Sequence, residues 1–84
     1  MLSEHVSQQT AFAAAYKAAR EIATGLGYVG YEADVIAQGA GNAAMHGDAT
    51  PEDVHEAIAH FRVADGGRET VLIAEAAYRA AMNA

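Results

Sequence analysis

Alanine supplies 22 of the 84 residues and half of the hydrophobic side chains. It has the highest helix propensity because ordering a methyl group loses no side-chain entropy. The same methyl group removes little apolar surface from water, so each alanine adds little to a hydrophobic core. The composition therefore predicts helices that form readily and pack closely around a thin core.

Glycine and proline divide the chain into four segments with helical periodicity, and no segment shows the alternation typical of strands. Ser3 or Ser7 can cap the first segment, and Gly25 and Gly27 end it. We therefore predict an all-α fold, a compact four-helix bundle-like single domain with short connections that contain glycine or proline. The expected helices cover residues 3–24, 32–45, 51–63 and 68–82.

The sharpest local signal is the helix start at Thr50-Pro51-Glu52-Asp53. Thr50 is predicted to be the N-cap and Pro51 the first helical residue, where its missing N–H is harmless. Glu52 and Asp53 then place negative charge in the first turn, which the helix dipole favours. This pattern predicts a well-defined start for the third helix.

The predicted second helix and the connector before it also carry recognisable patterns. Glycines in residues 25–31 permit positive φ, and we expect Tyr28, Val29 and Tyr31 to fold back onto the body. Within the helix, small residues recur four positions apart, which allows another helix to approach closely. These pairs are Ala37 and Gly41, Gly39 and Ala43, and Ala40 and Ala44.

Few bulky side chains are available for the core, so a partner chain that buries more apolar surface would help. This leaves a monomer and a homodimer equally open. The last predicted helix is apolar around most of its circumference, which indicates either a central helix or an interface with a second protein molecule. The expected core residues are Phe12, Tyr16, Ile22, Leu26, Val35, Ile36, Met45, Val54, Ile58, Phe61, Val71, Leu72, Ile73, Tyr78 and Met82.

The formal charge of −6 and a pI of about 4.9 describe an acidic protein. Direct binding of nucleic acid requires a basic stripe, and the five basic residues are scattered. There is no cysteine for a disulfide, a thiolate nucleophile or a zinc ligand. No apolar window is long enough for a membrane span, and the N-terminus does not resemble a signal peptide. We therefore expect a cytoplasmic protein with neither nucleic acid nor membrane as a direct partner.

Two motifs suggest ligand chemistry without establishing it. Residues 39–44 match the GxGxxA form of a dinucleotide-binding turn, but Gly47 and Pro51 interrupt the long helix that such a turn must open. A second group concentrates carboxylates and imidazoles between residues 46 and 60, with neither an HExxH motif nor a paired ExxH arrangement. We expect this group to be a solvated polar face. Its candidate metal ligands are His46, Glu52, Glu56 and His60.

No serine lies on a glycine elbow, and no base with an orienting partner can be identified. We therefore expect neither enzymatic activity nor a cofactor. The leading hypothesis is a small acidic protein-binding module that acts as a regulator, adaptor or inhibitor on a partner with a basic surface. One specific form is a phage-type viral inhibitor of a host nucleic-acid-binding or defence complex. The expected partner-binding residues are Glu32, Asp34, Asp48, Glu52, Asp53, Glu56, Leu72 and Tyr78.

Two alternatives stay open. The first is a structural self-assembling subunit, either a homodimer or a component of a particle, with the last helix as the self-contact. The second is a metal-binding helical protein that uses the cluster between residues 46 and 60.

Overall fold

The computed structural model describes residues 4–60 and 67–84. Within these residues the chain forms four helices and no strand. The helices are α1 (Glu4–Gly25), α2 (Tyr31–Ala44), α3 (Pro51–Ala59) and α4 (Arg68–Met82). This confirms the predicted all-α bundle. The predicted bounds hold to within one residue, except that α3 ends at Ala59 and His60 lies in a turn. Residues 61–63 of the predicted third helix, including Phe61, fall outside the described residues.

Local hydrogen bonds explain where α1 ends and where α3 begins. At the end of α1, the N–H of Tyr28 donates to the carbonyl of Ala23 at 3.0 Å, and Gly27 has a φ of +107°. This is the geometry of a Schellman cap, in which glycine adopts positive φ without strain. At the start of α3, Thr50 Oγ1 accepts from the N–H of Asp53, and Asp53 Oδ2 accepts from the N–H of Thr50. The predicted N-cap is therefore confirmed and is part of a reciprocal capping box.

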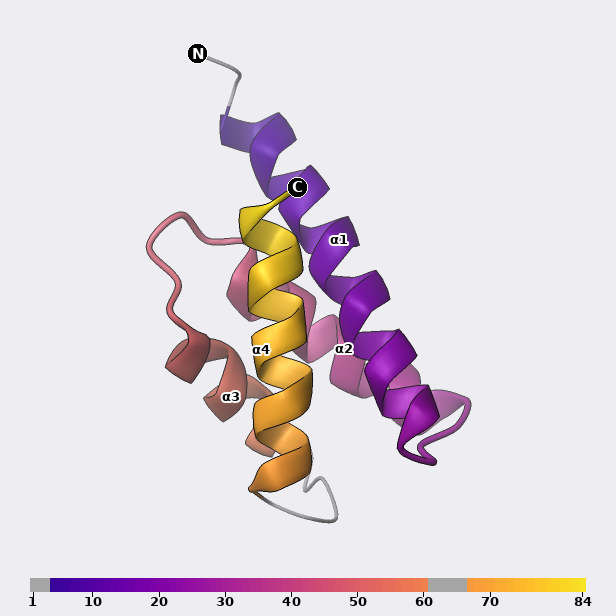
Figure 1. Ribbon diagram of the computed structural model, residues 1–84. Coiled ribbons are helices and arrows are strands. Elements are labelled where there is room, and N and C mark those ends of the chain that lie inside the picture. Colours follow the sequence, from indigo (N-terminus) through magenta and orange to yellow (C-terminus); the bar gives the residue numbers. More distant parts are fainter. Residues whose placement is uncertain (1–3, 61–66) are drawn as a thin grey trace.

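Figure 1 shows α4 lying between α3 and α1, with α2 behind it. The packing agrees with this view, since α4 contacts the other three helices. α1 packs against α2 and α4, and α3 packs against the same two helices. α1 and α3 therefore flank α4, and the side of α4 that faces the viewer has no neighbour among the described helices.

Alanine dominates the core. It supplies nine of the thirteen buried apolar residues in the described part of the chain. Three of them, Ala15, Ala19 and Ala23, lie four apart on α1, so their methyl groups form a continuous strip. The larger side chains of the core come from all the other helices, and they are Ile36, Val54, Ile58 and Ile73.

The predicted close approach is visible where α1 crosses α2. Gly41 is buried, and a β-carbon at this position would lie only 2.9 Å from two ring carbons of Phe12. The Phe12 ring therefore occupies the space that a side chain at position 41 would need. It also stacks on Tyr16, with 6.1 Å between the ring centroids and 23° between the planes.

The predicted core list is correct for four large residues and wrong for three. Ile36, Val54, Ile58 and Ile73 are buried, whereas Val71, Leu72 and Met82 are exposed on the outer side of α4. The reason is that α4 buries a different side, made of Thr70, Ile73, Ala74 and Ala77. The remaining described members are half-buried around the core, and they are Phe12, Tyr16, Ile22, Leu26, Val35, Met45 and Tyr78.

Candidate protein-binding surfaces

The negative charge of the protein is concentrated in one stretch of the chain. Residues 31–60 contain six carboxylates and no lysine or arginine, so they carry the entire formal charge of −6. The other five carboxylates and the five basic residues cancel. We call residues 31–60, which form α2, α3 and the turn between them, the acidic segment. A charge gathered in this way gives the molecule one strongly negative part and a remainder that is neutral on balance.

The structure divides the six carboxylates of the acidic segment into two groups. Asp53 belongs to the capping box of α3, and Asp34 accepts hydrogen bonds from the hydroxyl of Tyr16 and, at 3.4 Å, from Nε2 of Gln38. These two predicted partner-binding residues thus form hydrogen bonds within the fold itself. The other four are exposed and have no hydrogen-bond or ion-pair partner among the described residues, and they are Glu32, Asp48, Glu52 and Glu56.

The bond between Tyr16 and Asp34 ties α1 to α2. This hydrogen bond raises the pKa of Tyr16 above its ordinary value, because loss of the phenol proton would break it. Partial burial of the phenol and the negative charge of Asp34 raise this pKa further. Sequence analysis missed this pair, since eighteen positions separate the two residues and no local pattern joins them.

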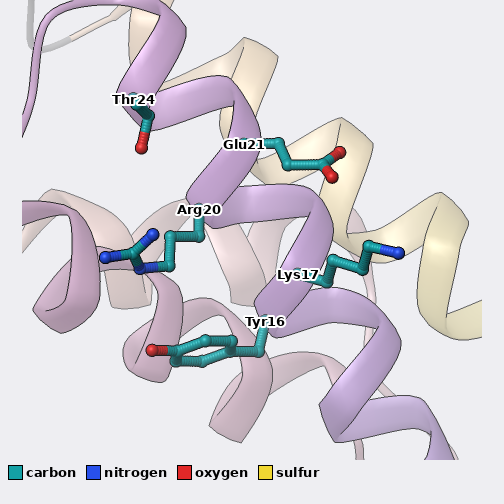
Figure 2. A pocket seen from close by; sticks show the side chains of 5 residues that line it. All are labelled: Tyr16, Lys17, Arg20, Glu21 and Thr24. Carbon is teal, nitrogen blue, oxygen red and sulfur yellow. The ribbon is translucent and has the colours of Figure 1, made fainter.

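A shallow hollow of about 460 Å³ lies along the surface of α1. Figure 2 shows that Tyr16 and Arg20 extend to one side of the helix, whereas Lys17 and Glu21 extend to the other. Thr24, one turn further along, completes the lining. These side chains therefore do not converge on a common point.

The outer side of α4 is the second surface of interest. Val71, Leu72 and Met82 are 41%, 48% and 65% exposed, which is high for large apolar side chains on one short helix. Glu75 and Arg79 are exposed between them. Of the predicted partner-binding residues, Leu72 lies on this side and Tyr78 is half-buried at its edge.

Grooves flank this side of α4. The groove toward α1 has a volume of about 470 Å³, and Ile22, Gly25, Leu26 and Ala76 contribute to its lining. Toward α3, a smaller groove of about 180 Å³ includes His55 and Val71. A third hollow of about 400 Å³ lies between Pro51 and the C-terminal half of α4, and Tyr78 and Met82 line it. The outer side of α4 is therefore a ridge between hollows, which is a shape that another helix could fit.

The connector between α1 and α2 differs in part from its prediction. Tyr28 folds back, and its hydroxyl donates to Oε1 of Glu69 on α4 at 2.7 Å. Val29 and Tyr31, which were expected to do the same, are 68% and 82% exposed. Gly30, with a φ of +55°, lies between these two residues and redirects the chain into α2. Sequence reasoning did not identify Val29 and Tyr31 as surface residues, because their apolar character suggested burial.

The candidate metal ligands do not form a site. His46, Glu52, Glu56 and His60 are all exposed. No group of three or more metal-binding side chains comes together anywhere in residues 4–60 and 67–84. Within the same residues, no helix has the length and apolar character needed to cross a bilayer.

Searches for related proteins found none. No protein-family model, no curated protein and no solved structure matches the chain.

Proposed function

We propose that the chain is a small protein-binding module whose acidic segment docks onto a basic surface of another protein. It would act by occupying that surface, as a regulator, adaptor or inhibitor, in the cytoplasm and without catalysis. A groove that otherwise holds nucleic acid is one surface of suitable charge, and an inhibitor of phage origin is one form that such a module takes.

The observation that supports this proposal is the concentration of the whole net charge in residues 31–60. The exposed carboxylates Glu32, Asp48, Glu52 and Glu56 are free to meet basic groups, since none is used within the described fold. An uneven charge of this kind steers association with an oppositely charged partner and accelerates it by roughly 10- to 1,000-fold at low salt.

The experiment begins with capture of partners from a lysate of the cells that make the protein. The bait is compared with a variant in which three carboxylates of the acidic segment become amides, Glu32→Gln, Glu52→Gln and Glu56→Gln. A matched control raises the net charge by the same amount elsewhere, with Gln9→Lys, Glu21→Gln and Thr24→Lys at exposed positions of α1. We expect a partner that the wild type and the control capture and that the acidic-segment variant loses.

Kinetics with the captured partner complete the test. The association rate should fall about tenfold or more as salt rises from 50 to 300 mM, because counterions screen the steering charge. An association rate independent of salt, or equal capture by all three proteins, would contradict docking through the acidic segment.

A further inference from the structure

We propose that the outer side of α4 binds α4 of a second copy of this chain, antiparallel and about a two-fold axis. Five exposed residues form a single stripe on this side, which we call the α4 stripe: Arg68, Leu72, Glu75, Arg79 and Met82. Their spacings of four, three, four and three residues keep them on one line along the helix, as in the seam of a coiled coil.

The α4 stripe is complementary to itself only when the helices run in opposite directions. If Glu75 faces Arg79 of the second copy, the same register places Leu72 opposite Met82 of the second copy. Two-fold symmetry then makes each contact twice, giving two ion pairs and two apolar contacts. A parallel arrangement would instead place Glu75 against Glu75 and Arg79 against Arg79, which is repulsive. The order of charges thus selects the antiparallel form.

The surroundings of the α4 stripe favour a second copy over an unrelated partner. α4 carries two acidic and two basic residues, so its formal charge is zero. Two copies can therefore meet through α4 although each carries a charge of −6, which resides in the acidic segment. Part of that segment, α2, lies behind α4 and away from the proposed contact (Figure 1).

The groove toward α1 gives the second copy a place to pack. Gly25 and Ala76 are small residues in its lining, and Ile22 and Leu26 supply apolar surface. A helix that lies against the α4 stripe can place side chains into this groove, in the ridge-into-groove manner of helix pairs. The exposed parts of Leu72 and Met82 would then be covered. This contact does not depend on the proposed function, and it leaves α2 free to bind another protein.

Sedimentation equilibrium from about 1 µM to 1 mM tests the pairing by charge exchange. The wild type should form a dimer within this range, since a contact of one helix face is small. Glu75→Arg and Arg79→Glu should each raise the dissociation constant about tenfold or more, because each creates two like-charge contacts. The double variant Glu75→Arg/Arg79→Glu restores opposite charges and should return the constant to within about threefold of the wild type.

Controls separate this pairing from a general effect of charge. Glu56→Arg and Lys17→Glu change the net charge by the same amounts away from α4, and they should leave the dimer intact. Far-UV circular dichroism should show unchanged helix content in all variants, because every substituted residue is exposed. A wild type that stays monomeric to 1 mM, or a double variant as weak as the single ones, would overturn the proposal.

Disulfide trapping supplies a second measurement, and the chain has no cysteine of its own to interfere. The pair Leu72→Cys/Met82→Cys should be oxidised to a covalent dimer, because the register places these positions opposite each other. Leu72→Cys alone should not be trapped, since its two copies would lie about 15 Å apart along the axis. Trapping of the single variant instead would overturn the antiparallel register.

Discussion

Thr70, in the first turn of α4, is a buried polar residue whose replacement by an apolar one should stabilise the protein. Its side chain is completely buried, and Oγ1 has no hydrogen-bond partner among the described residues. Leaving a buried hydroxyl unpaired costs about 1–3 kcal/mol of stability. Thr70→Val replaces this hydroxyl with a methyl group of similar size, and the two residues have similar helix propensities. We therefore expect the free energy of unfolding to rise by about 1–3 kcal/mol.

Urea unfolding followed by circular dichroism measures this change, and an unchanged m-value would show that only stability has shifted. In thermal unfolding, each 1 kcal/mol corresponds to roughly 4–8 °C for a chain of this size. The matched control is Thr24→Val at an exposed position, where we expect a change within about 0.5 kcal/mol. A loss of stability in Thr70→Val would refute the reasoning, because it would mean that the hydroxyl makes a favourable bond.

Three further substitutions test the packing and the link between α1 and α2. Gly41→Ala should destabilise by about 1 kcal/mol in urea unfolding, because the clash with Phe12 outweighs a gain in helix propensity of about 1 kcal/mol. In a Phe12→Leu background, Gly41→Ala should instead raise the free energy of unfolding. A double-mutant cycle that shows no coupling energy between positions 12 and 41 would contradict the contact. Because folding raises the pKa of Tyr16, the hydrogen bond from Tyr16 to Asp34 contributes fully to stability below about pH 10. This contribution declines as the pH rises through the folded-state pKa of Tyr16. Tyr16→Phe should therefore flatten the alkaline fall in stability, and an unchanged pH profile would argue against this bond. Ala37→Leu should destabilise the protein by about 1–3 kcal/mol, because it overfills a fully buried site. Its control, Ala13→Leu at an exposed site, should not destabilise the protein. Equal urea midpoints for the two variants would contradict this difference.

Local patterns explain why the helices could be predicted from the sequence. The cap at Thr50 and the stop at Gly27 depend only on neighbouring residues, so composition and spacing were enough to place both. The small residues around Gly41 correctly indicated close approach of another helix, although they could not identify Phe12 as the side chain that fills the space.

The sequence could not predict which side of α4 faces the core, and the physical reason is the composition of this helix. Apolar residues cover most of its circumference, so their periodicity does not indicate which side is buried. Packing against α1, α2 and α3 makes that choice, and it buries Thr70 and Ile73 while Leu72 and Met82 stay exposed. The bond between Tyr16 and Asp34 was also missed because it depends on how α1 and α2 are packed.

The alanine-lined core also determines how this protein can change over evolutionary time. In most domains, core substitutions that remove methyl groups are the common route to damage, because large side chains leave cavities behind. At positions such as Ala19, Ala23 and Ala40 there is almost nothing to remove, and every side chain but glycine is larger. Drift at these positions is therefore restricted to residues about as small as alanine. The interior can diverge very little, and most of the variation between future descendants of this sequence must accumulate on its outside.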